Sequence, residues 1–80
     1  MRRGEVWWAE LPQPVGRRPV LLLSRDTAYR VRTSVTVAVI TSTIRNIPTE
    51  VPLNQEDGMP VKCVVNLDDI LTIPKSKLAE

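Results

Sequence analysis

The sequence predicts a small, mostly antiparallel β barrel with one short helix. Several short runs rich in β-branched residues are separated by loops that contain proline, glycine or polar residues. No connection offers the dozen or more residues that a parallel crossover needs. The 80 residues support one domain, which at this size buries only about 60% of its unfolded surface. We therefore expect a mostly β, α+β domain with five or six strands.

The first part of the chain predicts two strands and a helix. Residues 5–9 have the β-branched and aromatic bias of a strand, and the prolines and glycine of residues 11–16 end it. Residues 19–23 are continuously apolar, which predicts a strand covered on both faces and the most protected segment of the fold. In residues 24–30, Ser24 is placed to cap the N-terminus of a helix of one or two turns.

The middle of the chain predicts two more strands. Residues 35–41 are rich in β-branched residues, and Thr41 lies at the C-terminal end of the strand that they predict. One face of this strand carries Val35, Val37, Val39 and Thr41. Residues 42–48 end at a proline and predict a loop. Residues 49–53 predict an edge strand, where proline is tolerated.

The last part of the chain predicts two short strands and the start of a helix. Residues 54–58 form a polar turn, after which residues 61–67 alternate as a strand with Val61, Cys63, Val65 and Leu67 on one face. Residues 69–73 predict another strand. Residues 74–78 predict the opening of a helix.

The positive charge is concentrated in the first half of the sequence. Residues 1–45 hold eight arginines against three acids, and residues 46–80 hold three lysines against six acids, so the halves carry +5 and −3. Arginine suits bidentate contacts to phosphate and stacking on bases. The pattern is consistent with a polyanionic partner and equally with a solvated, arginine-rich surface.

The composition excludes several classes of function. The chain has no histidine and one cysteine, Cys63, so it offers no internal disulfide and no zinc or haem site. We expect no cofactor and no metal, and any acid–base chemistry must use arginine, lysine, threonine, serine, tyrosine or carboxyl side chains. The longest apolar run is too short to span a membrane, and no signal-peptide core follows Met1, so we expect a cytoplasmic protein.

Four segments of the chain carry a family resemblance. They are residues 3–9 with the Trp7-Trp8 pair, residues 16–24 with Arg18-Pro19, residues 40–44 and residues 64–73. In this order and spacing they resemble the MazF/PemK/Kid family of type II toxin–antitoxin toxins. The resemblance implies an SH3-like barrel, a homodimer and metal-independent, sequence-specific cleavage of single-stranded messenger RNA to a 2′,3′-cyclic phosphate. It also implies inhibition by a MazE-like antitoxin whose acidic C-terminal tail occupies the RNA groove.

The sequence departs from the family pattern at three places. The family continues into a C-terminal helix, so residues 1–80 are expected to be a single toxin domain shortened at its C-terminus. Many members carry an acidic residue in the loop before the Arg-Pro pair, whereas residues 12–17 have none. Some relatives have arginine where Asn66 stands, so their catalytic set does not transfer to this chain.

The resemblance implies that Arg18 and Thr41 are the catalytic residues. A guanidinium stays protonated and suits the charge that develops on a phosphorane, and a hydroxyl at a strand end can donate to a phosphate oxygen. Ser42, Thr43 and Asp68 are possible supporting residues. The alternatives are that Arg18 is an ordinary surface cation, that Thr41 only satisfies a backbone group, and that Asp68 only forms a turn.

Several aromatic and basic residues are candidates for RNA binding. Trp7 and Trp8 point to opposite faces of a strand, so at most one belongs fully to the core and the other can stack on a base. Packing of both is the alternative. The arginines expected to contact phosphate are Arg17, Arg25, Arg30, Arg32 and Arg45. Such contacts provide affinity and salt sensitivity rather than sequence choice.

Two other functions remain open from the sequence. The related CcdB toxins share the barrel but poison gyrase without cutting nucleic acid. A catalytically idle fragment that binds antitoxin or RNA is the second alternative.

Overall fold

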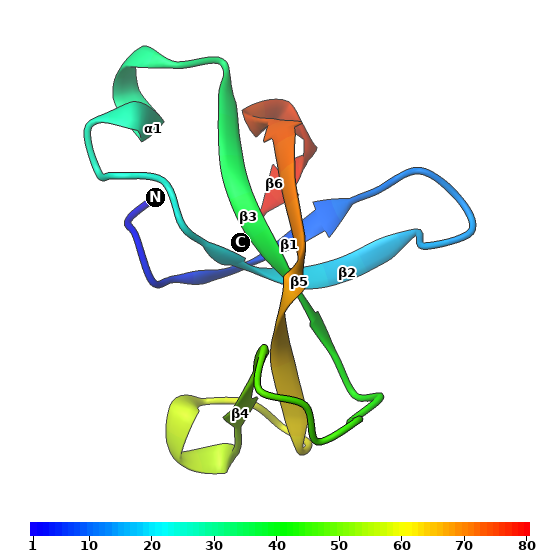
Figure 1. The fold of residues 1–80 in the computed structure, drawn as a ribbon. Coiled ribbons are helices and arrows are strands. Elements are labelled where there is room, and N and C mark those ends of the chain that lie inside the picture. The colour runs from blue at the N-terminus through cyan, green and yellow to red at the C-terminus, as the bar shows by residue number, and fades with distance from the viewer.

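The computed structural model describes residues 1–80, which form one six-stranded antiparallel sheet and one short helix (Figure 1). The elements are β1 (Val6–Glu10), β2 (Arg17–Leu22), α1 (Ala28–Val31), β3 (Ser34–Thr41), β4 (Glu50–Leu53), β5 (Cys63–Pro74) and β6 (Leu78–Ala79). Single 3₁₀ turns lie at Gln55–Asp57 and Lys75–Lys77. The mostly β, antiparallel fold with a helix after the second strand is confirmed. No helix is long and apolar enough to cross a membrane.

The strands follow the order β4-β5-β3-β2-β1-β6, so β4 and β6 form the two edges. The prediction of an edge strand near residues 49–53 is confirmed. Pro52 lies in this strand, and proline is tolerated at a sheet edge because its missing N–H removes no bond from a second neighbour. The central position belongs to β3 and β2, and most of the buried residues lie in β3 and β5.

Strand β5 differs from the sequence prediction, because the two strands expected at residues 61–67 and 69–73 are one long, bent strand. Its pairing with β3 jumps from Asn66, opposite Val39, to Ile70, opposite Ala38. The three residues between have no partner in β3, and such a bulge bends a strand. The Leu67 N–H instead donates to the Thr49 carbonyl at 2.9 Å. Loss of alternation in the bulge leaves Leu67 exposed, whereas it was expected on the face of Cys63.

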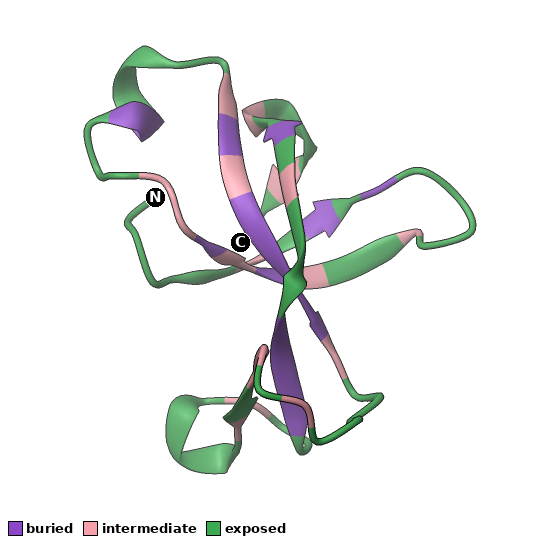
Figure 2. Cartoon of the chain, viewed as in Figure 1, coloured by how far each residue is buried: buried purple, intermediate pink, exposed green.

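Two buried clusters lie on the two faces of the sheet, and β3 contributes to both. Val35, Val37 and Val39 belong to the larger cluster, and Ala38 and Ile40 belong to the smaller one. Figure 2 shows buried residues along β3 and the first part of β5. The prediction that residues 19–23 are the most protected was therefore wrong. Strand β2 borders the short β1, whereas β3 is covered by β2 and the long β5.

The helix begins later than predicted, because Ser24 is used elsewhere. The Ser24 Oγ accepts a hydrogen bond from the Thr36 N–H at 2.8 Å and so fastens the end of β2 to β3. Thr27 occupies the N-cap position of α1 without a side-chain hydrogen bond. The short α1 is held by tertiary packing, since Ala28 and Tyr29 are both buried.

The predicted C-terminal helix opening is a 3₁₀ turn followed by β6. The Lys75 N–H donates to the Thr33 carbonyl at 2.8 Å, which ties this turn to the connection after α1. Leu78 and Ala79 then pair with Ala9 and Trp8 of β1. The side chain of Leu78 packs against the larger cluster, so apolar contact with the sheet favours the strand.

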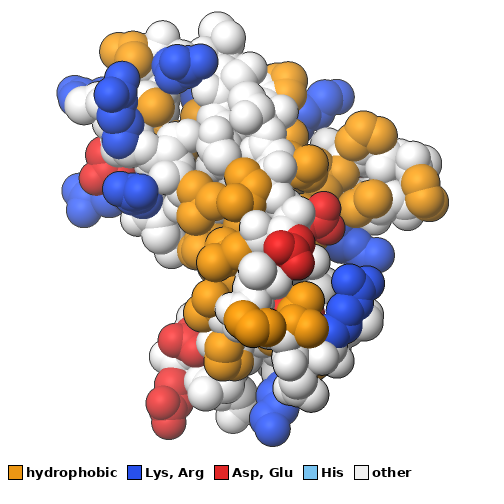
Figure 3. Space-filling view, in the orientation of Figure 1, with side chains coloured by type: hydrophobic (Ala, Val, Ile, Leu, Met, Phe, Trp, Pro, Cys, Tyr) orange, Lys and Arg blue, Asp and Glu red, His pale blue; other side chains and the backbone are white.

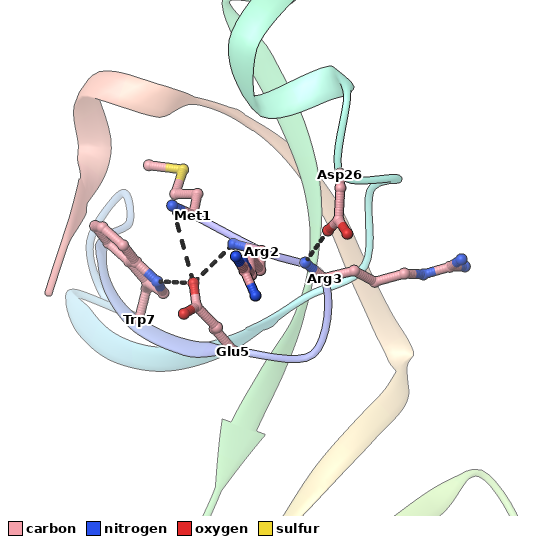
Figure 4. A network of polar contacts seen from close by, with 6 residues as sticks. All are labelled: Met1, Arg2, Arg3, Glu5, Trp7 and Asp26. Atoms are coloured by element: carbon pink, nitrogen blue, oxygen red, sulfur yellow. Dashed lines mark hydrogen bonds and ion pairs between the residues drawn. The ribbon is translucent and has the colours of Figure 1, made fainter.

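The N-terminal segment is organised by the carboxylate of Glu5 (Figure 4). Its Oε1 accepts hydrogen bonds from the Trp7 Nε1–H at 3.1 Å and the Arg2 N–H at 2.7 Å, and lies 3.9 Å from the Met1 amino group. Hydrogen bonds from Trp7 and then Arg2 hold the pKa of Glu5 below its ordinary value. The ionised form therefore contributes stability.

This pKa shift predicts a pH-dependent effect of Glu5→Gln. A lowered folded pKa means that the contribution is present above the unfolded pKa and is lost as pH falls through the folded pKa. We expect Glu5→Gln to lower Tm at neutral pH and to match the wild type in acid, measured by thermal melts over a pH series. Glu56→Gln, whose carboxylate makes no hydrogen bond, should leave Tm unchanged. A Glu5→Gln difference that persists undiminished in acid would contradict the prediction.

Candidate active site

A cavity of about 580 Å³ opens where β1, β2 and β3 meet the loop before β5. This volume lies within the range of roughly 300–1,000 Å³ that is typical of small-molecule sites. Its walls include Val6, Trp8, Pro19, Ile40, Met59 and Val61. Its polar groups come from Arg18, Thr41, Ser42, Asp57 and Glu80. The cavity therefore combines apolar walls with one cation, hydroxyls and two carboxylates.

The strand register explains why Arg18 and Thr41 reach the same cavity. Val20 of β2 pairs with Val39 of β3 in an antiparallel ladder. Two residues further along each strand, in the direction of the cavity, the chain reaches Arg18 and Thr41. The ladder ends at Val20 and Val39, so Arg18 and Thr41 lie just beyond the paired segment, where both line the cavity. Residues 23 positions apart in sequence are thus brought together by the β2–β3 pairing.

Thr41 is half-buried, and its hydroxyl is already used once. The Oγ1 accepts a hydrogen bond from the Thr43 N–H at 3.1 Å, in the turn that follows β3. Thr41 thus satisfies a backbone group, as the structural alternative expected. A hydroxyl that accepts one bond still carries a proton to donate. Ser42 also lines the cavity, whereas Thr43 does not.

Arg18 is exposed and forms no ion pair, in contrast to its neighbour Arg17. The Arg17 guanidinium lies 5.0 Å from the centroid of the Trp8 ring, and its Nε lies 4.0 Å from Glu10 Oε1. Both contacts are at the surface and are expected to be weak individually. Arg18 therefore lines the cavity, and no protein carboxylate forms an ion pair with its guanidinium.

The two tryptophans have different environments, as their alternation predicts. Trp7 is half-buried, packs against the larger cluster and donates to Glu5. Trp8 is 43% exposed and lines the cavity with Arg17 over its ring. The expectation that only one of them belongs to the core is met by Trp7. Both rings line the cavity, and Trp8 is the more exposed of the two.

The predicted site residues that do not line the cavity are Thr43, Asp68 and the arginines Arg17, Arg25, Arg30, Arg32 and Arg45. The Asp68 Oδ2 accepts a hydrogen bond from the Thr49 hydroxyl at 2.8 Å, and Asp68 does not line the cavity with Arg18. Arg25 lies just before α1, at the other end of β3. Arg45 lies in the loop after β3, where its N–H donates to Glu50 Oε1 at 2.9 Å.

One wall of the cavity comes from residues 57–61, which the sequence did not single out. The 3₁₀ turn before this wall is fixed by two side chains: Asn54 Oδ1 accepts from the Glu56 N–H at 2.8 Å, and Asp57 Oδ2 accepts from the Asn54 N–H at 3.0 Å. Gly58 follows with φ of 86°, a conformation that favours glycine. The spacing of Asn54, Asp57 and Gly58 was the available signal for this turn, although nothing in it indicated the cavity.

Cys63 also borders the cavity, but its thiol is poorly reactive. The side chain is buried, and burial raises the pKa of its thiol above the ordinary value. A protonated thiol is a poor nucleophile. No group of three or more cysteine, aspartate or glutamate side chains converges to form a metal site.

Comparisons of the sequence and of the structure with known proteins lead to the same family. A family model described as "PemK-like, MazF-like toxin of type II toxin-antitoxin system" matches residues 2–80. The chain belongs to this family. The sequence prediction of a MazF/PemK toxin is therefore confirmed, and the mostly β fold is the MazF-like one.

Several mycobacterial members of the PemK/MazF family are similar to this chain. It is 44% identical over 72 residues to "Probable endoribonuclease MazF5" of Mycobacterium tuberculosis, covering 89% of this chain and 65% of that protein. It is 43% identical over 77 residues to "Probable endoribonuclease MazF2" of the same species, covering 95% of this chain and 74% of that protein. The chain thus spans slightly less than two thirds of MazF5.

Solved MazF structures share the backbone arrangement. The "Mycobacterium tuberculosis toxin MazF-mt6" superposes with a TM-score of 0.85 at 39% identity, covering 94% of this chain and 73% of that one. An "Endoribonuclease in complex with its cognate antitoxin from Mycobacterial species" superposes with a TM-score of 0.83 at 30% identity, covering all of this chain and 74% of that one. The sheet described above is therefore the common core of these toxins.

Proposed function

We propose that this chain is the endoribonuclease toxin of a type II toxin–antitoxin pair and cuts single-stranded messenger RNA at short sequence motifs. The observation that carries the proposal is the meeting of Arg18 and Thr41 at one cavity. The names of two similar MazF relatives, each called a probable endoribonuclease, support the reaction class. The strongly bent sheet supports the SH3-like barrel that the family resemblance implies.

The proposed reaction is a transfer within the RNA and consumes no co-reactant. The 2′-hydroxyl oxygen loses its proton and bonds to the neighbouring phosphorus, and the bond from phosphorus to the 5′-oxygen breaks. The leaving 5′-oxygen takes up a proton. The products are a 2′,3′-cyclic phosphate and a 5′-hydroxyl, and the reaction is proposed to need no metal.

Arg18 and Thr41 have different roles in this proposal. The Arg18 guanidinium is a fixed cation that stabilises the charge on the phosphorane oxygens, which grows in the transition state. The Thr41 hydroxyl donates its free proton to a phosphate oxygen while its own oxygen accepts from Thr43. That second contact fixes the orientation of the hydroxyl. Ser42 supplies another hydroxyl at the same wall.

The RNA is proposed to stack on Trp8, the exposed tryptophan of the cavity. Aromatic stacking on a base is worth about 1–3 kcal/mol and tolerates any base. The Arg17 guanidinium lies over one side of the ring, and Arg17 and Arg45 are proposed to contact phosphates of the RNA. Trp7 contributes indirectly, by packing β1 onto the core.

The proposed partners are a second copy of the chain and an antitoxin with an acidic tail. Similar toxins have been solved with antitoxins, including the mycobacterial complex and a "MazE-MazF" structure from Deinococcus radiodurans. The acidic tail is proposed to pair with Arg18, which forms no ion pair within the chain. The tail and the RNA would then compete for the same cavity.

The proposed function is tested by RNA cleavage in EDTA with Thr41 variants. We expect the wild type to cut single-stranded RNA and leave 2′,3′-cyclic phosphate ends, identified by mass spectrometry. Thr41→Val keeps the shape but removes the donor, and should lower kcat by about 10²-fold, the usual cost of one lost transition-state donor. Thr41→Ser keeps the hydroxyl and should retain most of the activity.

Two outcomes would contradict this proposal. Equal rates for Thr41→Val and the wild type would remove Thr41 from the mechanism. Failure of the wild type to cut any RNA, together with capture of gyrase, would favour the CcdB-like alternative.

A further inference from the structure

The positive charge of the molecule gathers around α1, away from the cavity. We define the α1 face as Arg2, Arg3, Arg25, Arg30, Arg32 and Lys75. Figure 3 shows basic side chains clustered over the part of the molecule where Figure 1 places α1 and the N-terminus. Lys75 joins the face because its Nζ donates to the Tyr29 carbonyl at 2.7 Å. The only acids nearby along the chain are Glu5 and Asp26, which leaves a local excess of four positive charges.

The two acids of this region do not neutralise the arginine side chains. The Glu5 carboxylate accepts from the Arg2 N–H and from Trp7, and Asp26 Oδ1 accepts from the Arg3 N–H at 2.7 Å (Figure 4). The molecule contains two ion pairs, from the Met1 amino group to Glu5 and from Arg17 to Glu10. All five guanidinium groups of the α1 face are therefore exposed and free of carboxylate partners.

The cavity alone is poorly equipped to attract RNA. It presents one cation, Arg18, against the carboxylates of Asp57 and Glu80. Affinity for nucleic acid depends on several phosphates being neutralised by lysine or arginine. A cleavage site with this balance of charges needs lysine or arginine side chains elsewhere along the path of the RNA. The α1 face gathers several such cations.

The cavity and the α1 face lie at opposite ends of the same strand. Strand β3 begins at Ser34, two residues after Arg32, and ends at Thr41. Seven steps along a strand span roughly 23 Å at about 3.3 Å each. An RNA of modest length can therefore reach both.

We propose that the α1 face binds the phosphates of the RNA strand whose scissile phosphate lies in the cavity. The inference rests on the proposed function, since it assumes that RNA is the substrate. The face holds the strand without selecting its sequence, because contacts to phosphate carry no base information. Sequence choice belongs to the cavity, and affinity belongs largely to the α1 face.

The test compares RNA binding by the wild type, Arg30→Gln/Arg32→Gln and Arg30→Lys/Arg32→Lys. The probes are 2′-O-methyl RNAs, which lack the attacking hydroxyl, of about 4 and about 16 nucleotides, the limits of common single-strand site sizes. Dissociation constants are measured between about 50 and 200 mM salt. For the long RNA, the Gln variant should give a salt slope shallower by about 1.4, since each single-strand phosphate contact contributes about 0.7. The Lys variant keeps the charge and should keep the slope.

The short RNA should bind all three proteins alike, because it covers the cavity only. Equal salt slopes for the long RNA would overturn the proposal. An equal loss for the short and the long RNA in the Gln variant would also overturn it, as a general effect of net charge. A third result would also overturn the proposal: the Gln variant loses binding to a polyglutamate peptide but binds the long RNA as the wild type does. The α1 face would then bind an acidic protein instead.

Cleavage of unmodified RNA by the wild type separates this inference from the proposed function. Absence of cleavage with the expected salt slopes would remove the proposed reaction and still support the α1 face as an RNA-binding surface.

Discussion

Arg18→Ala is expected to lower kcat for RNA cleavage by about 10³-fold, at the upper end of the usual loss for one transition-state group and at the lower end for a catalytic arginine. Arg18 is the one cation of the cavity, so no second Lys or Arg of the cavity can take its place. Because the charge on the phosphorane exceeds that on the bound phosphate, its loss should appear in kcat more than in KM. Single-turnover cleavage of a defined RNA measures this.

Two matched variants sharpen the test of Arg18. Arg18→Lys keeps the charge but loses the planar fork of donors, so we expect activity between those of the wild type and Arg18→Ala. Arg17→Ala removes the neighbouring cation, which lies over Trp8, and should change KM rather than kcat. If Arg18→Ala retained wild-type kcat, the assignment of the cavity as the catalytic site would fail.

Leu22→Ala is expected to lower the free energy of unfolding by about 3 kcal/mol, within the usual range for deleting a buried leucine side chain. Leu22 has no exposed surface, pairs with Val37 and belongs to the larger cluster. In a domain of this size each kcal/mol shifts Tm by about 4–8 °C, so Tm should fall by about 12–24 °C. Thermal denaturation followed by circular dichroism measures the change.

The control for Leu22→Ala is Val31→Ala, which also shortens an aliphatic side chain. Val31 is 76% exposed on α1, and surface substitutions of this kind usually stay within about 0.5 kcal/mol. Similar losses in the two variants would show that the larger cluster is not the main source of stability.

The sequence predicted the strands well where burial alone decides the pattern. The apolar run of residues 19–23 and the valines of residues 35–41 became β2 and β3, and the edge strand around Pro52 was recognised by its proline. The predictions failed where a contact distant in sequence intervenes. Ser24 accepts from Thr36 rather than capping α1, and residues 67–69 bulge out of a single strand. Neither the Ser24–Thr36 hydrogen bond nor the bulge can be recognised from the residues next to it in sequence.

The candidate site divides in the same way. The family resemblance pointed to Arg18 and Thr41, and the β2–β3 register brings both to one cavity. The wall from residues 57–61 was missed because its position depends on how the turn after β4 folds back over β3. Arg25 was grouped with Arg17 and Arg45 as a candidate for phosphate contacts because all three lie in the basic half of the sequence. Charge counted along a chain does not distinguish the two ends of one strand.

The sharing of β3 between both buried clusters has a consequence for hydrogen exchange. Val35, Val37 and Val39 face one cluster while Ala38 and Ile40 face the other, so neither side of the sheet can open without disturbing the same strand. The amides of β3 should then exchange with solvent only when the entire domain unfolds, and denaturation should follow a single transition. Neither cluster should therefore stay folded once the other has unfolded.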